Sequence, residues 1–214
     1  MEKMIITTFT DPMMGLTYEC EPIYEKLQVH YPQIQFRWIM SVLVRDVSDF
    51  MYPDETIIQY NQRLAKIYES EQKIGGLPIV MPNLRLFDEK HRSSLPLNLA
   101  YKAAQLADNE KADEFLKNLR HATIVDVLPT THFDEILKVV RKTGIDENRF
   151  ILLYHNGSAQ TELQKDLKIV HELGIHTLPA YMIQYNERAV IVRSLISYEN
   201  FVSIIEQLKK EETT

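Results

Sequence analysis

The sequence predicts an α/β fold in which an opening β-α-β unit and a closing β-β-α unit flank a central block of helices. Three observations carry this prediction: a short apolar run at 4–10, mostly helical periodicity from about residue 55 to 174, and strand-like patterning again at 180–192. The chain has 214 residues, 45% hydrophobic and 25% charged, which suits one large domain or a small fold with a sizeable insertion.

The opening unit begins with Met4–Thr10, a β-branched and apolar run typical of a buried strand. Asp11-Pro12 ends it, because proline supplies no N–H and restrains the residue before it. Helical spacing follows from about 17 to 30, with Pro22 in the first turns, where a missing N–H costs least. Ile34–Val44 is strand-like again, so a right-handed crossover should make the two strands parallel.

The central block is predicted to be helical. Glu55–Glu71 is one candidate helix, 75–83 is irregular, and a helix with Pro96 in its first turn runs to about Ala107. Apolar residues at helical spacing mark further helices at 112–119, 133–140 and 159–170, the last ending near Gly174.

The closing unit is a hairpin followed by a helix. Ala180–Tyr185 and Ala189–Val192 are short strands around a turn-like Asn186-Glu187-Arg188. An amphipathic pattern at 201–208 then predicts the last helix.

This order of elements divides the chain into two parts. Residues 1–54 and 175–214 should form one domain, and 55–174 an insertion that interrupts its sheet.

Composition and charge narrow the function classes. The net charge is −6 and no Lys/Arg-rich run stands out, which argues against a nucleic-acid partner. No stretch approaches the roughly 20 apolar residues that span a bilayer, and no secretory pattern precedes the first strand, so we expect a cytoplasmic protein away from membranes. Cys20 stands alone, so neither an intramolecular disulfide nor a cysteine-based zinc site can form.

Two short motifs lie at corresponding ends of the predicted sheet. Asp11-Pro12 ends the first strand and Glu21-Pro22 follows in the helix, while His176-Thr177-Leu178-Pro179 leads into the strand at 180. This pattern resembles the thioredoxin fold of the DsbA-like family, where a strand ends in D-P-x-C-x-x-C and a cis-proline loop lies beside it. The resemblance covers nearly the whole chain.

The resemblance implies where a dithiol centre would lie. Aligning Asp11-Pro12 and Glu21-Pro22 with the same pairs of the family pattern places Met14, Gly15, Leu16 and Thr17 at the C-x-x-C positions. Met14 and Thr17 then stand in place of the two cysteines. Pro179 is then the candidate cis-proline.

Two further stretches are similar to the FrnE/SpxH-YjbH-like branch of this family. They are Arg92–Pro96 leading into Ala100–Ala104, and Gln164–Ile169. Members of the SpxH branch are cytosolic proteins of Gram-positive bacteria, and the resemblance implies a role as an adaptor that delivers the regulator Spx to the ClpXP protease.

The residues themselves argue against thiol–disulfide exchange. A thioether has no ionisable proton, so Met14 cannot attack a disulfide. Thr17 keeps a hydroxyl but has no base beside it in the sequence. Cys20 lies about one turn further into the helix, where the N-terminal field has faded. We therefore interpret Cys20 as a buried thiol of the hydrophobic core, and the alternative is that Cys20 alone has a thiol function.

The leading hypothesis is therefore a polypeptide-binding adaptor or chaperone-like module that needs no cofactor. Its predicted contact residues are Met13, Met14, Thr17, Leu178 and Pro179. Methionines adapt to varied partners, so an apolar 13–16 segment suits peptide docking, and inert packing of a former active site is the competing interpretation. The histidines show no metal-ligand spacing, which predicts no metal site.

The alternative is an enzyme. Kappa-class glutathione transferases and DsbA-related oxidoreductases or isomerases share this architecture, and the former hold the glutathione thiolate with a serine near the helix start. In this chain Thr17 would have to take that role.

Overall fold

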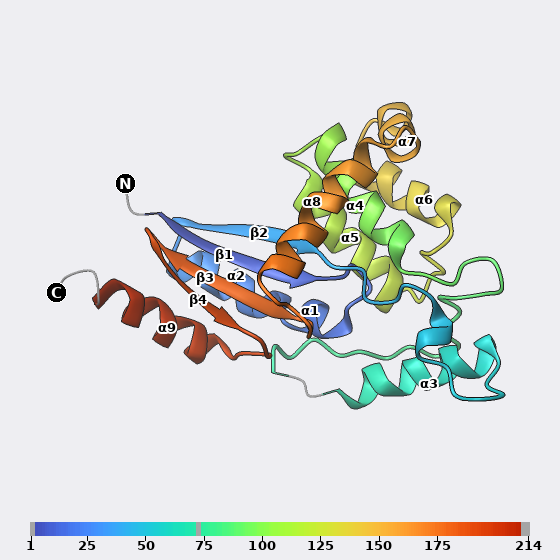
Figure 1. The fold of residues 1–214 in the computed structure, drawn as a ribbon, viewed down its shortest axis with the longest axis horizontal. Helices are drawn as coiled ribbons and strands as arrows, with labels where there is room; N and C mark the ends of the chain where they lie inside the picture. The colour runs from blue at the N-terminus through green and yellow to red at the C-terminus, as the bar shows by residue number, and fades with distance from the viewer. Residues whose placement is uncertain (1–2, 72–73, 211–214) are drawn as a thin grey trace.

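The computed structural model describes residues 3–71 and 74–210, and it has the predicted α/β fold (Figure 1). The strands are β1 (Met4–Thr10), β2 (Ile34–Met40), β3 (Ala180–Tyr185) and β4 (Arg188–Val192). The helices are α1 (Gly15–Glu19), α2 (Glu21–His30), α3 (Ile57–Ser70), α4 (Leu95–Ala107), α5 (Ala112–Ile124), α6 (Phe133–Thr143), α7 (Glu147–His155), α8 (Ser158–Glu172) and α9 (Tyr198–Lys210). A 3₁₀ turn, η1, spans Val47–Asp49.

The four strands of the described residues form one sheet in the order β2-β1-β3-β4. The β1 and β2 strands are parallel, with Met4 opposite Ile34, as the crossover rule predicts. The β3 strand is antiparallel to both β1 and β4, so the closing hairpin joins the sheet beside β1.

The β1 strand is buried on both faces of the sheet, and its successive side chains point to opposite sides. Met4 and Ile6 of β1 pack with residues of α2 and α9, including Leu27 and Phe201. Phe9 points the other way, into a cluster with the end of α8. The apolar residues that predicted these helices therefore form the two covers of the sheet.

The opening helix differs from its predicted form. The helical region begins earlier than expected, at Gly15, and splits into α1 and α2 at Cys20. Pro22 lies in the first turn of α2. It therefore stands at the start of a helix, where its missing N–H costs little, and not within one long helix. The β2 strand stops at Met40 instead of Val44, because its neighbour β1 ends at Thr10 and leaves nothing further to pair with.

The helices of the insertion gather at one end of the sheet. Figure 1 shows α4 to α8 stacked together at the upper right, α3 along the lower edge, and α9 beneath the sheet at the left. Helix α7 was not predicted individually, and only its Phe150 is buried. None of the helices in residues 3–71 and 74–210 has the length and apolar character needed to cross a membrane.

Candidate functional site

The loop that would carry a dithiol centre joins β1 to α1, and the insertion covers it. Met13 is fully buried and Met14 is 6% exposed. The Tyr68 hydroxyl of α3 donates a 2.8 Å hydrogen bond to the Met13 carbonyl. A side chain at Gly15 would meet Ile79 and Tyr68 at 3.2 and 3.3 Å, so this loop is already in contact with the insertion. The positions that correspond to C-x-x-C are therefore packed against protein.

Asp11 holds the start of this loop in place. One carboxylate oxygen accepts the Met13 N–H at 3.0 Å, and the other accepts the Leu43 N–H at 2.9 Å. The second oxygen also accepts the Ser94 hydroxyl at 2.6 Å and the Asn98 amide at 2.8 Å. Burial raises the pKa of Asp11, and these four donors oppose that shift. This aspartate thus ties the end of β1 to the first turn of α4.

The Thr17 hydroxyl is committed to the protein interior. It lies 2.8 Å from the Thr10 hydroxyl, and both residues are fully buried. The Thr10 hydroxyl also lies 3.2 Å from the Asp11 carbonyl, and either hydroxyl can be the donor within the threonine pair. The Thr17 hydroxyl is therefore hydrogen-bonded inside the protein and is not placed to donate to a bound thiolate.

Cys20 lies at the junction of α1 and α2 and is 1% exposed. Burial, followed by the neighbouring Glu19 carboxylate, raises the pKa of its thiol to about 12. Glu19 is buried as well and accepts the N–H groups of Gly75 and Gly76 at 2.5 and 2.7 Å. A Cβ on Gly75 would lie 2.0 Å from the Glu19 carbonyl oxygen, which explains the glycine at this close approach.

We expect Cys20 to be inert toward thiol reagents in the folded protein. The thiolate is the reacting form, and a pKa raised from 9.0 to about 12 lowers its fraction at pH 8 roughly 10³-fold. Iodoacetamide alkylation followed by mass spectrometry should therefore be slow in buffer, rise with pH, and be complete in denaturant. Rapid modification of the native protein at pH 8 would instead show an accessible thiol and revive a monothiol function.

The proline loop opposite this site also takes the form that the family resemblance implies. The peptide bond between Leu178 and Pro179 is cis. Pro179 is buried and Leu178 half-buried, whereas His176 and Thr177 are exposed.

The five residues predicted to contact a partner (Met13, Met14, Thr17, Leu178 and Pro179) thus offer little surface. Among them only Leu178 is more than marginally exposed. The geometry favours the competing interpretation, in which the 13–16 segment is inert packing, because α3 and Ile79 already cover it.

The two sequence stretches that resemble the SpxH branch meet at a buried ion pair. The Lys102 ammonium of α4 lies 2.5 Å from an Asp166 carboxylate oxygen of α8, and both side chains are less than a tenth exposed. The same oxygen accepts the Met40 N–H at the end of β2, at 2.8 Å. This contact joins two insertion helices to the central sheet.

A groove opens beside that ion pair, between α8, the start of α4 and the chain that leaves β2. Its volume is about 570 Å³. The lining residues are Val42, Arg45, Ser93, Leu95, Gln160, Gln164, Leu167, Lys168 and His171. Sequence analysis missed this groove, because its walls come from three separate segments. The basic Arg45, Lys168 and His171 are exposed, and none of the described residues that line the groove carries a carboxylate.

These observations define a class: a thioredoxin-fold protein of the DsbA-like type whose dithiol positions are filled by Met14 and Thr17. A family model described as thioredoxin matches residues 7–203. The chain belongs to that thioredoxin family.

Curated relatives include two bacterial proteins, each named ClpXP adapter protein SpxH. The protein from Halalkalibacterium halodurans is 24% identical over 207 residues, which is 95% of this chain and 67% of the relative. The protein from Bacillus subtilis is 23% identical over 214 residues, covering 97% and 68% respectively. The chain thus spans about two thirds of the length of these relatives.

Solved structures agree on the fold. A proposed protein disulfide isomerase from Nitrosomonas europaea superposes with a TM-score of 0.79 at 16% identity, covering 98% of both chains. The cytosolic disulfide reductase DsbM from Pseudomonas aeruginosa gives 0.64 at 15% identity, covering 96% of this chain and 98% of its own. At these identities the likeness establishes the fold alone.

Proposed function

We propose that this protein is a polypeptide-binding adaptor of the SpxH type, working in the cytoplasm without thiol chemistry or a cofactor. One observation carries the proposal: the positions of the dithiol centre are buried under α3, while an open groove of about 570 Å³ remains beside α8. The SpxH relatives, which are named as ClpXP adapters, support the same function class.

The chemistry of the groove favours an extended and acidic segment of a partner protein. Val42, Leu95 and Leu167 give it an apolar floor. The side-chain amides of Gln160 and Gln164 can each donate to and accept from a peptide backbone. Basic groups on the wall complement carboxylates, which steers encounter and sets specificity.

An acid beside Lys168 partly offsets the charge of the basic wall. Lys168 lies 3.7 Å from Glu172, but its side chain is 75% exposed, so the pair is weak and the lysine can turn to a partner. Arg45 is exposed at the opposite side of the groove, among the residues that follow β2. We therefore place the main electrostatic contact at Arg45.

The glutathione-dependent alternative finds less support. It needs a hydroxyl at the helix start that can hold a thiolate, and the only hydroxyl of the 14–17 segment belongs to Thr17. That group is buried and hydrogen-bonded to the Thr10 hydroxyl.

The proposal is tested by a degradation assay. Purified ClpXP and Spx from Bacillus subtilis are incubated with and without the chain, and the loss of Spx is followed over time. We expect the chain to accelerate degradation. Arg45→Glu should weaken this effect about tenfold, because it replaces an attractive charge at the binding surface with a repulsive one.

Lys66→Glu is the matched control. Lys66 is an exposed residue of α3 outside the groove, and its reversal changes the net charge by the same amount. Insulin reduction is measured in parallel, with Met14→Cys/Thr17→Cys as the variant that restores the missing thiols. Dithiol turnover by the wild-type chain, or equal loss of stimulation in the Arg45 and Lys66 variants, would overturn the proposal.

A further inference from the structure

Two histidines that are far apart in the sequence converge on one aspartate in the insertion. His91 Nδ1 lies 3.0 and 3.1 Å from the two carboxylate oxygens of Asp88, and His132 Nε2 lies 2.7 Å from Oδ2. The two imidazole rings stack with their centroids 3.8 Å apart. One ligand atom from each residue falls within 4.8 Å of the other two. Sequence spacing predicted no ligand set here, because the histidines lie on different segments.

We propose that Asp88, His91 and His132 form a binding site for a divalent transition-metal ion of the zinc type. Two imidazole nitrogens and one carboxylate oxygen are a donor set that zinc accepts, with a fourth position left for water or another ligand. Asp88 and His132 also line a neighbouring cavity of about 490 Å³, so the fourth position has room on that side.

The carboxylate is already turned so that one oxygen remains for a metal. Oδ1 of Asp88 accepts the backbone N–H groups of Lys90 and His91, at 2.8 and 2.9 Å. The Asp88 N–H in turn donates to the His91 carbonyl at 3.2 Å, which closes a tight turn. Oδ2 is the atom that faces His132, and it is the atom we assign as the metal ligand.

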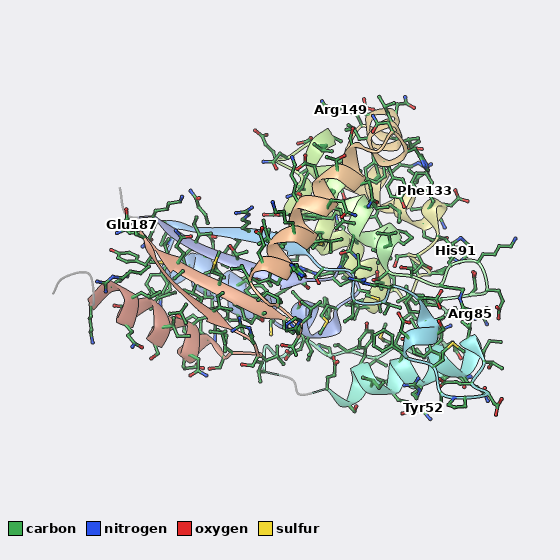
Figure 2. The ribbon with its side chains drawn as sticks, viewed as in Figure 1. Tyr52, Arg85, His91, Phe133, Arg149 and Glu187 are labelled. Atoms are coloured by element: carbon green, nitrogen blue, oxygen red, sulfur yellow. The ribbon has the colours of Figure 1, made fainter. Side chains whose placement is uncertain are left out.

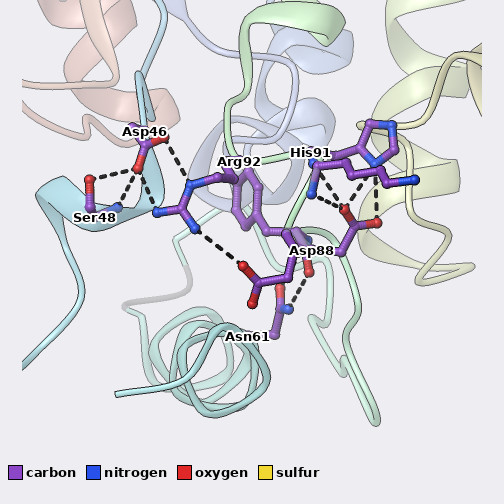
Figure 3. A network of polar contacts seen from close by, with 9 residues as sticks. Asp46, Ser48, Asn61, Asp88, His91 and Arg92 are labelled. Atoms are coloured by element: carbon purple, nitrogen blue, oxygen red, sulfur yellow. Dashed lines mark hydrogen bonds and ion pairs between the residues drawn. The ribbon is translucent and has the colours of Figure 1, made fainter. Parts of the chain in front are cut away.

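Each of the two segments that carry the ligands is held by further hydrogen bonds, and Figure 3 shows those of the segment with Asp88 and His91. Asn61 of α3 exchanges two hydrogen bonds with the Phe87 backbone, at 2.8 and 3.1 Å. Arg92 makes two bonds to Asp46, at 2.9 and 3.1 Å. The buried Thr131 hydroxyl donates to the Leu86 carbonyl, next to His132. Such outer contacts orient metal ligands and lower the entropic cost of binding.

The carboxylate oxygen needs to move only slightly from each imidazole nitrogen to admit an ion. Metal–ligand bonds of 2.0–2.2 Å at tetrahedral angles place ligand atoms about 3.3–3.6 Å apart. Asp88 Oδ2 lies 2.7 Å from His132 Nε2 and 3.1 Å from His91 Nδ1, and the three ligand atoms all lie within 4.8 Å of one another. The side chains are 33% to 44% exposed and can separate by this amount. On binding, the ion takes the place of the protons that bridge the imidazoles and the carboxylate.

The site lies within the insertion, between the 88–91 turn and His132 at the start of α6. Figure 2 places His91 near Phe133 of α6 and Arg85, at the opposite end of the molecule from Glu187 in the β3–β4 turn. A bound ion would cross-link the 88–91 turn to the start of α6, so it should stabilise the insertion.

Metal titration of the full chain, purified without a polyhistidine tag, tests the inference. We expect saturable binding of one Zn²⁺ by calorimetry and a rise in Tm that grows with Zn²⁺ concentration. Co²⁺ should bind at the same place and give the visible absorption of a low-coordinate nitrogen–oxygen site. His91→Ala and His132→Ala should each weaken binding at least about tenfold.

His121→Ala is the control, because His121 forms a comparable exposed pair with Asp126 at 3.3 Å but is not part of the three-residue group. The Tm of each variant without metal shows that it is folded, and two separate histidine variants guard against the failure of one. No saturable Zn²⁺ binding by the wild type, or equal affinity in the His91 and His121 variants, would overturn the assignment. Neither result bears on the adaptor function.

Discussion

Replacing Asp166 with alanine is expected to lower the free energy of unfolding by about 3–5 kcal/mol. The change leaves the Lys102 ammonium in the interior, where the Gln105 side chain at 3.0 Å is its one remaining hydrogen-bond partner among residues 3–71 and 74–210. It also removes the acceptor of the Met40 N–H at the end of β2. Urea denaturation followed by circular dichroism measures the loss.

An exposed pair on the same helix supplies the control. Lys165 and Glu162 of α8 lie 2.6 Å apart, with side chains 64% and 36% exposed. Because solvent screens such a pair, Glu162→Ala should change stability by less than about 0.5 kcal/mol. The double variant Lys102→Met/Asp166→Leu should recover much of the loss, since it removes both buried charges together. A cost for Asp166→Ala no larger than that for Glu162→Ala would contradict the structural role of the pair.

The strands were predictable because short-range patterns decide them. Both ends of β1 and β3 agree with the prediction, since β-branched and apolar runs bounded by breakers are rarely anything else. Helix α7 was missed because only Phe150 among its residues is buried, so it carries no apolar stripe. At the split of the first helix, Gly75 lies against the backbone of Glu19 and Cys20, a contact that no local pattern reveals.

The sequence predicted the loss of dithiol chemistry at the candidate site, but it did not predict which side chains cover the 13–16 segment. The loss of dithiol exchange follows from Met14 and Thr17 alone. The cover over this loop comes from Tyr68 and Ile79, more than 50 residues further on, and nothing in their local pattern points to it. The same holds for Lys102 and Asp166. Lysine is ordinarily an exposed residue, so the α4 sequence does not indicate that Lys102 is buried or which acid pairs with it.

Asp11→Ala should be among the most destabilising substitutions in the chain, at about 3–6 kcal/mol. The carboxylate accepts the N–H groups of the buried Met13 and the half-buried Leu43, and the side-chain donors of Ser94 and Asn98. Ser94 can turn to the Val44 carbonyl at 3.3 Å, so three donors lose their acceptor. Each unsatisfied buried donor costs about 1–3 kcal/mol, which is a large part of the 5–15 kcal/mol that holds a typical domain together.

Asp11→Asn keeps the experiment informative if the alanine variant fails to fold. Asparagine retains one acceptor oxygen but directs an NH₂ group at other donors, so we expect a loss that is roughly half as large. Thr7→Val on the same strand is the control, because the Thr7 hydroxyl is buried without a hydrogen-bond partner among the described residues. Removing it should be neutral or slightly stabilising. If Asp11→Asn and Thr7→Val unfold at the same urea concentration, Asp11 does not tie β1 to the insertion, and the buried active-site loop must owe its shape to packing alone.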